Sequence, residues 1–225
     1  MIDDEVQADV RAARELAASA HLEGGVLDGV SWSATDSERA VDLPPTWRSV
    51  EDVPAHVRDV LRIGRSDLIA VAAHCRETGA WAPLLASTNA WVYGPSGYGA
   101  WRTRRILDLV DVEHRLGAAI ATLDADGPVE AYYLLNNAGH LHGWGPALFT
   151  RFLAVADLRG TGCALGLDAR LATAVNALVP GSDLASADWG TAEYAFYLAL
   201  LDRISAAIGV EVTVVEEGLA AKFAD

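Results

Sequence analysis

The chain has 225 residues, of which 52% are hydrophobic, and its formal net charge at pH 7 is −14. This length can bury a substantial core in one domain or two lobes, and the composition is typical of a globular chain. No apolar run reaches the roughly 18 residues of a membrane helix, and the acidic start of the chain lacks the pattern of a secretory signal. The two cysteines, Cys75 and Cys163, have no metal-type spacing, so we expect reduced thiols and a cytoplasmic location.

Charge is unevenly distributed along the chain. Residues 1–59 carry a net charge of −8 and residues 181–225 carry −6, whereas residues 60–180 are neutral. The acidic balance argues against a general nucleic-acid coat protein, although the central segment could still present a basic face. Sixteen of the 17 basic residues are arginines, and the one lysine is Lys222. The central part of the chain therefore has no lysine that could form a Schiff base.

Apolar periodicity predicts an all-α fold, in which residues 1–45 form an N-terminal helix and loop and residues 46–225 form the main helical domain. In chain order, the expected helices are 3–19, one from Pro54, 66–79 with Ser66 as N-cap, one after Pro83, one or two within 100–127, 128–137, 146–156, 168–178 and 188–209. Residues 22–37 and the glycine-rich residues 95–99 are expected to be loops. Residues 210–215 are either the one strand or an extended lead-in to a last helix.

The expected helical hairpin 128–156 contains two glycines near its turn. Gly143 and Gly145 permit backbone conformations and close approaches that a side chain would block. The first turn of the second helix has unpaired amide groups, which together with the helix dipole favour an anion such as a phosphate. Two interpretations fit this pattern, a turn whose glycines serve only the chain reversal and a backbone cradle for a phosphate.

Asp168 stands where the N-cap of a helix is expected, ahead of Leu171 and Val175 on one helical face. A structural cap is one interpretation. A carboxylate that accepts amide hydrogen bonds also keeps a low pKa and stays ionised. Asp168 could therefore stabilise a developing oxocarbenium ion, or orient a water, while an N-glycosidic bond is cleaved.

The densest basic cluster of the chain lies beside two aromatic residues. It comprises Arg102, Arg104 and Arg105, next to Tyr98 and Trp101. Arginines beside aromatic rings can bind phosphates and stack on bases. The alternative is a solvated helix face that forms ion pairs with nearby aspartates. His140 and His142 flank the hairpin without cysteine or glutamate partners, so we predict no metal site there.

Together, the hairpin and Asp168 resemble the helix-hairpin-helix DNA glycosylase superfamily. The superfamily motif runs Leu-x-Gly-hydrophobic-Gly and is followed further along the chain by an aspartate that begins a helix. Leu141, Gly143, Trp144 and Gly145 match this motif, and Asp168 lies 23 residues after Gly145. Residues 60–225 are also similar to one bacterial branch, the 8-oxoguanine DNA glycosylase fold proteins. This similarity is clearest in residues 83–107, 127–157, 164–175 and 214–223.

The resemblance implies a two-lobed helical bundle of the glycosylase type that acts on double-stranded DNA. The hairpin amides would hold a DNA phosphate, directly or through a monovalent cation, and no other cofactor is implied. The target base would be flipped into a pocket between the lobes, where Asp168 assists its loss. The implied phosphate contacts are Gly143, Gly145, Arg102, Arg104, Arg105 and Arg151. The candidate pocket walls are Trp91, Tyr93, Trp101 and Trp144.

One position departs from the pattern of the bifunctional glycosylases. Those proteins carry a Schiff-base lysine two residues after the second hairpin glycine, and here that position is Ala147. The next basic residue is Arg151, but arginine is almost never deprotonated and is a poor amine nucleophile. We therefore expect no Schiff-base lyase activity. Arg151 is better interpreted as a phosphate contact or a structural ion-pair partner.

Two functions remain in view. The leading hypothesis is a monofunctional DNA glycosylase that removes a modified base, such as an oxidised purine, in base excision repair or in defence against modified foreign DNA. The alternative is a non-catalytic module of the same fold that binds DNA, or binds a protein partner through its acidic flanks. The net charge of −14 predicts that any DNA binding weakens steeply with salt.

Overall fold

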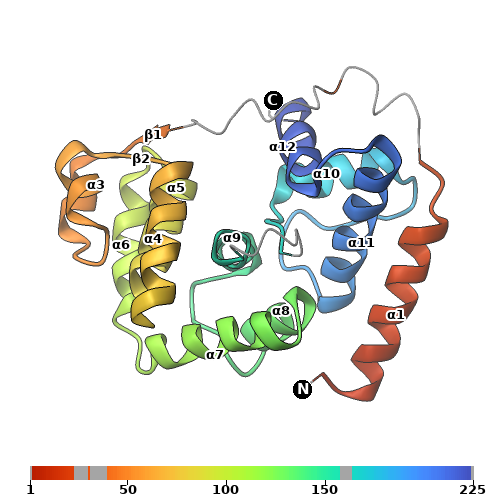
Figure 1. Ribbon diagram of the computed structural model, residues 1–225, viewed down its shortest axis with the longest axis horizontal. Coiled ribbons are helices and arrows are strands. Elements are labelled where there is room, and N and C mark those ends of the chain that lie inside the picture. Colours follow the sequence, from red (N-terminus) through yellow and green to blue (C-terminus); the bar gives the residue numbers. More distant parts are fainter. Residues whose placement is uncertain (1, 23–29, 31–39, 158–163, 224–225) are drawn as a thin grey trace.

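The computed structural model describes residues 2–22, 30, 40–157 and 164–223, and within them it is almost entirely helical (Figure 1). One group of elements forms a lobe on one side of the molecule and has its own core around Trp47, Val57 and Ile63. The members of this group are β1 (Ala40–Asp42), the 3₁₀ helix η1 (Pro45–Ser49), α3 (Ala55–Val60), β2 (Arg62–Gly64), α4 (Arg65–Thr78), α5 (Ala82–Tyr93) and α6 (Gly97–Leu107).

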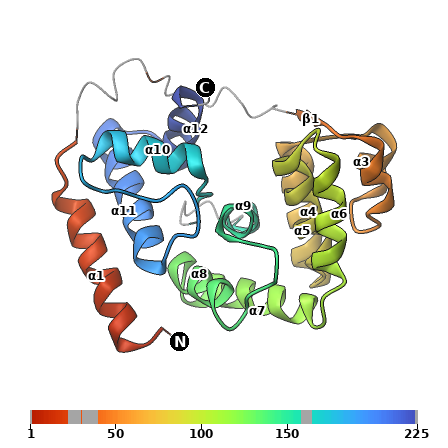
Figure 2. The same ribbon diagram turned by 180° about the vertical axis from the view of Figure 1, so that it is seen from behind.

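A second group of helices lies on the opposite side, as both views of the ribbon show (Figures 1 and 2). It contains α1 (Asp4–Ser19), α10 (Ala169–Leu178), α11 (Thr191–Ile208) and α12 (Val212–Lys222). The remaining helices are α7 (Val112–Ala125) and α8 (Pro128–Asn136), which run below the two groups, and α9 (Pro146–Ala156), which lies between them. The predicted all-α, two-lobed fold is confirmed. None of the described helices is long and apolar enough to cross a bilayer.

The central helix α9 is surrounded by the core. Phe149, Phe152 and Leu153 have no exposed surface. The rings of Trp81 and Trp144 both pack edge-on against Phe152, with centroid distances of 6.4 and 5.3 Å. Burying a large apolar side chain of this kind contributes about 1.5–3 kcal/mol. Packing therefore holds α9, and the turn that precedes it, in one position.

The N-terminal helix α1 belongs to the second lobe. Val10 is buried in a small apolar cluster with residues of α8 and α11. Arg203 of α11 donates hydrogen bonds to the carbonyl oxygens of Ala17 (3.0 Å) and Ala20 (2.6 Å) at the end of α1. The helix predicted at 3–19 is confirmed, and most of the predicted loop 22–37 lies outside the described residues. The predicted domain boundary at residue 45 falls at the start of η1.

The prediction for residues 210–215 was wrong, because α12 already begins at Val212. Val212, Val215 and Leu219 are buried on one face at helical spacing, so packing overrides the β propensity of valine. The strands in the described residues are instead β1 and β2, which pair antiparallel with Ala40 opposite Gly64. The sequence did not reveal them because strands of three residues carry almost no periodicity.

Two predicted helix boundaries in the first lobe were also wrong. The N-cap of α4 is Gly64 and not Ser66, because the carboxylate of Asp67 accepts the Gly64 N–H at 2.8 Å. The helix expected from Pro54 is short, since Leu61 adopts a left-handed conformation with φ of 53° and ends α3. This early stop allows the chain to enter β2.

The glycine-rich residues 95–99 are only partly a loop, because α6 begins at Gly97. At Gly99 the helix passes so close to Tyr93 that an added Cβ would lie 2.4 Å from the Tyr93 Cβ. Gly99 therefore permits the close packing of α6 on the end of α5, and this is a structural reason for a glycine in this helix.

Candidate functional site

The hairpin between α8 and α9 has a tight turn at its tip. Trp144 donates its backbone N–H to the carbonyl oxygen of Leu141 at 2.9 Å, and Gly143 within this turn has a φ of +85°. Such a conformation strongly favours glycine. The carbonyl oxygen of Gly145 then accepts the N–H groups of Leu148 (2.9 Å) and Phe149 (3.1 Å), which starts α9.

Within the described residues, the N-terminal end of α9 has unused backbone donors next to open space. Pro146 has no N–H, and the N–H groups of Gly145 and Ala147 donate to no group in the described chain. A Cβ added at Gly145 would meet no atom within 4 Å. Two free amides at the positive end of a helix, next to open space, form a suitable place for an anion.

Buried side chains beneath the hairpin attach it to the first lobe. Trp144 is 1% exposed, and its indole N–H donates to Asn89 Oδ1 at 3.2 Å. The amide nitrogen of Asn89 donates in turn to Thr103 Oγ1 of α6 at 3.1 Å. Arg102, also on α6, donates its Nε–H to the carbonyl oxygen of Gly143 at 2.8 Å. Trp144 thus anchors the hairpin from within the core, and one arginine of the basic cluster touches the hairpin directly.

The rest of the basic cluster lies on the outer face of α6. Arg104 is exposed and makes a long contact of 3.4 Å with Ser49 Oγ. Arg105 lies over the ring of Trp101 at 5.3 Å, and Trp101 is 47% exposed. Trp101 is therefore a surface residue while Trp144 is a core residue, so these two candidate pocket walls do not share a pocket in this structure. Trp91 is half-buried against the core of the first lobe.

Asp168 caps α10, as the sequence predicted. One carboxylate oxygen accepts the backbone N–H groups of Arg170 (3.0 Å) and Leu171 (3.1 Å). The other accepts from the guanidinium groups of Arg151 (3.2 Å) and Arg170 (3.1 Å). Burial alone would raise the pKa of Asp168, but the charge of Arg151 and the Leu171 amide outweigh it and the pKa is lowered. The carboxylate is ionised, and its four acceptor positions are filled.

Arg151 lies between Asp168 and a second carboxylate that the sequence did not indicate. Its second guanidinium nitrogen donates to Glu216 Oε1 at 2.6 Å. The Arg151 side chain is 14% exposed and that of Glu216 is 10% exposed. Burial lowers the pKa of Arg151, but the two carboxylates outweigh this effect and raise it. This geometry supports the interpretation of Arg151 as a structural ion-pair partner.

Residues 164–167 pass directly behind Arg151 and Glu216. Tyr194 and Tyr197 of α11 donate their hydroxyls to the carbonyl oxygens of Leu165 and Gly166, both at 2.9 Å. A Cβ added to Gly166 would lie 2.4 Å from Cδ and Nε of Arg151. Only a glycine at position 166 therefore leaves room for Arg151 to reach both carboxylates.

Glu216 and Gly166 are the two residues that sequence reasoning missed. A usable signal did exist for Glu216, because it shares one helical face with the buried Val212, Val215 and Leu219. A glutamate on a buried apolar face needs a partner. No comparable signal marks Gly166, since its neighbour Arg151 is distant in sequence.

This arrangement can be compared with known families. Residues 30–220 match the model of the family described as "Putative 8-oxoguanine DNA glycosylase OGG-like protein". The chain belongs to this OGG-like family. Membership gives the chain a DNA glycosylase-type function and agrees with the resemblance seen in the sequence. A search of curated proteins and a search of solved structures returned no match.

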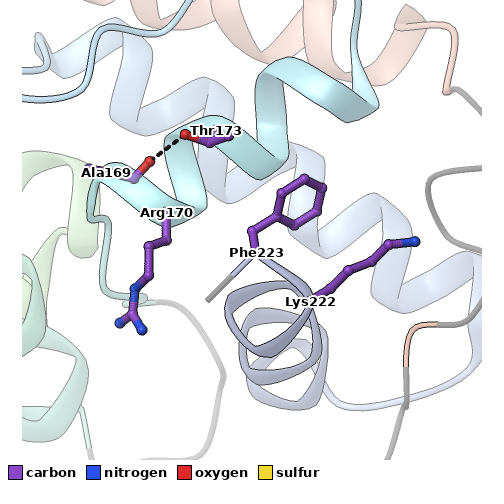
Figure 3. Close-up of a pocket in the computed structure, with 5 residues that line it drawn as sticks. All are labelled: Ala169, Arg170, Thr173, Lys222 and Phe223. Carbon is purple, nitrogen blue, oxygen red and sulfur yellow. Dashed lines mark hydrogen bonds between the residues drawn. The ribbon is translucent and has the colours of Figure 1, made fainter. Parts of the chain in front are cut away.

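In this OGG-like chain, a hollow of about 290 Å³ adjoins the start of α10. Figure 3 shows the residues that line it, Ala169, Arg170, Thr173, Lys222 and Phe223. The ring of Phe223 faces α10, while the side chains of Arg170 and Lys222 extend in different directions (Figure 3). Lys222 is remote from Asp168 in sequence, yet the fold brings it beside the helix that Asp168 caps.

Within the described residues, the histidines beside the hairpin and the buried Cys75 add no metal-binding group to this site. His140 and His142 are exposed, and no group of three or more His, Cys, Asp or Glu side chains in the described residues could hold a metal ion. Cys75 is buried in the core, and burial raises the pKa of its thiol to about 11. Cys163 lies outside the described residues.

Proposed function

We propose that this OGG-like protein is a monofunctional DNA glycosylase that hydrolyses the N-glycosidic bond of a modified base, with an oxidised purine as the leading substrate. The observation that carries the proposal is that one helix, α9, links both parts of the site. Its N-terminus presents the free amides of Gly145 and Ala147, and its next turns present Arg151, which holds Asp168. Six residues of helix correspond to about 9 Å along the axis. The helix therefore fixes the position of Asp168 relative to the amides that would bind a phosphate.

In the proposed reaction the hairpin amides hold a phosphate of the DNA backbone, and the target nucleotide leaves the base stack. Positive charge develops on the sugar as the bond to the base breaks. An ionised, rigidly held carboxylate stabilises that charge without reorganising. Because hydrogen bonds fill both oxygens of Asp168, we propose that it acts by its charge and does not activate the water. The base leaves with the electron pair of the broken bond and takes up a proton, and the water that adds to the sugar carbon releases a proton to the solvent.

Other DNA contacts belong to the same proposal. Arg102, Arg104 and Arg105 of α6 would neutralise phosphates on the side of the hairpin, because Arg102 already contacts Gly143. Exposed Trp101, beside Arg105, would stack on a base. We propose no Schiff-base step, because Ala147 stands at the lysine position and Lys222 points away from Arg170 (Figure 3).

The second candidate is a non-catalytic module that binds DNA. The filled hydrogen-bonding capacity of Asp168 favours it, since a carboxylate engaged by two arginines can be purely structural. The acidic flanks of the chain provide a surface for a protein partner in this version.

A base-release assay separates the two candidates. Duplex oligonucleotides with 8-oxoguanine and other oxidised purines, each opposite all four bases, are incubated with the protein and then cleaved at abasic sites with alkali. We expect release by the wild type and a loss of about a hundredfold or more in Asp168→Asn. Asp202→Asn is the matched control, because Asp202 is an exposed aspartate of α11. If the wild type binds the duplexes at low salt and releases none of these bases, the non-catalytic module is the better account.

A further inference from the structure

Two adjacent glutamates of α12 have different surroundings. Glu217 is partly exposed and forms an ion pair with Arg65, at the start of α4 in the first lobe. Glu216 is 7% exposed, and its Oε1 accepts both Arg151 at 2.6 Å and the backbone N–H of Gly166 at 3.0 Å. The chain therefore places the carboxylate of Glu217 near the surface and that of Glu216 in the interior.

Glu216, Arg151 and Asp168 form one connected group, which we call the buried charge cluster. The guanidinium of Arg151 bonds Glu216 at 2.6 Å and Asp168 at 3.2 Å, so the shorter bond goes to the residue farther from the proposed reaction. The two carboxylates and the Arg151 guanidinium carry a formal charge of −1, and the partly exposed Arg170, which also bonds Asp168, brings the sum to zero. With a neutral residue in place of Glu216, both arginines would face Asp168 alone and the same groups would carry a formal charge of +1.

The hydrogen bonds that Glu216 accepts do not themselves require a charge. Burying the Glu216 carboxylate costs desolvation free energy that its ion pair with Arg151 only partly returns, and Arg151 retains Asp168 as a partner when Glu216 is neutralised. A glutamine at position 216 could accept the same two hydrogen bonds from Arg151 and Gly166 through its amide oxygen. What only glutamate supplies is the negative charge.

We infer that Glu216 is a positioning residue of the proposed excision reaction, whose charge offsets that of Arg151 and keeps the groups around Asp168 from becoming net cationic beside the reacting sugar. This inference rests on the proposed function. A negative charge at Glu216 stabilises the positively charged sugar of the transition state more than the neutral sugar of the bound substrate, and such differential stabilisation raises kcat. Without Glu216, Arg151 and Arg170 together would outweigh the charge of Asp168 where that charge is needed.

The test is a comparison of Glu216→Gln with the wild type on the best substrate of the base-release assay, with kcat and KM measured separately. We expect kcat to fall about thirtyfold, which corresponds to about 2 kcal/mol. KM for the duplex should stay the same or decrease, because removing a negative charge does not weaken binding to a polyanion. Glu217→Gln is the matched control, since it removes the same charge one residue away and should keep kcat within about twofold of the wild type.

Each outcome decides the inference. An unchanged kcat in Glu216→Gln, with an active wild type, overturns it and leaves the proposed function standing. A large rise in KM together with a lower melting temperature also overturns it, because that pair of changes identifies a structural role. If the wild type releases no base, the proposed function fails first. The electrostatic part is then judged by carbon-detected NMR titration, in which the pKa of Asp168 should be lower in Glu216→Gln than in the wild type, and an unchanged value contradicts it.

Discussion

The hairpin and the buried charge cluster are the two halves of the proposed site, and they are built in opposite ways. The hairpin is a continuous stretch, Leu141 to Phe149, whose turn is closed by backbone hydrogen bonds between neighbours. The cluster joins side chains from α9, from the start of α10 and from α12. Each half contains a glycine, but in different surroundings, since Gly145 borders open space and Gly166 borders the Arg151 side chain. Binding and chemistry should therefore respond differently to the same kind of substitution.

The largest effect is expected from Arg151→Ala. This change leaves Asp168 and Glu216 close together, nearly buried and without their shared cation. Removing one partner of a buried ion pair typically lowers the free energy of unfolding by about 3–5 kcal/mol. Urea unfolding measures the loss.

Arg170→Ala is the matched control for that change. Arg170 also bonds Asp168, but its side chain is 41% exposed, so the loss should stay at or below about 1 kcal/mol. Equal losses in the two variants would show that Arg151 is not the centre of the cluster.

A smaller effect is expected from Gly166→Ala. The new Cβ would stand 2.4 Å from Arg151, and the backbone around it is held by Tyr197 on the carbonyl side and Glu216 on the amide side. Overpacking of this kind costs about 1–3 kcal/mol, which a denaturation curve resolves. A variant as stable as the wild type would mean that Arg151 reaches Asp168 by another route.

The same substitution at Gly145 should affect binding more than stability. Its Cβ meets no protein atom within 4 Å, so the loss of stability should remain below about 1 kcal/mol. A phosphate that approaches the Gly145 amide would meet that methyl group, and we expect affinity for duplex DNA to fall about tenfold, or about 1.4 kcal/mol. Filter binding at low salt measures this. Unchanged affinity would separate the hairpin from DNA binding.

Local sequence patterns predicted the features that depend on residues close together in the chain. The all-α fold follows from apolar periodicity, and the N-cap at Asp168 from the residue type just ahead of such a run. The turn at Gly143 and Gly145 could also be located from residue type, because glycines are typical of such turns.

Long-range contacts account for what the sequence could not predict. Glu216 meets Arg151 across 65 residues of chain, and no spacing rule connects them. The same limit applies to Trp144, whose place in the core depends on Asn89, 55 residues earlier. Residues 210–215 show that packing can also override a local preference. Their β propensity is outweighed by the burial of Val212 and Val215 on one helical face.

The most direct test of the whole account is a crystal structure of the Asp168→Asn protein bound to a duplex that contains 8-oxoguanine. Asparagine retains the size of the side chain and part of its capping capacity, so the complex should form without turnover. We expect a backbone phosphate within hydrogen-bonding distance of the Gly145 and Ala147 amides, and the sugar of the flipped nucleotide facing position 168. A duplex bound on another face, with no phosphate at these amides, would contradict the account.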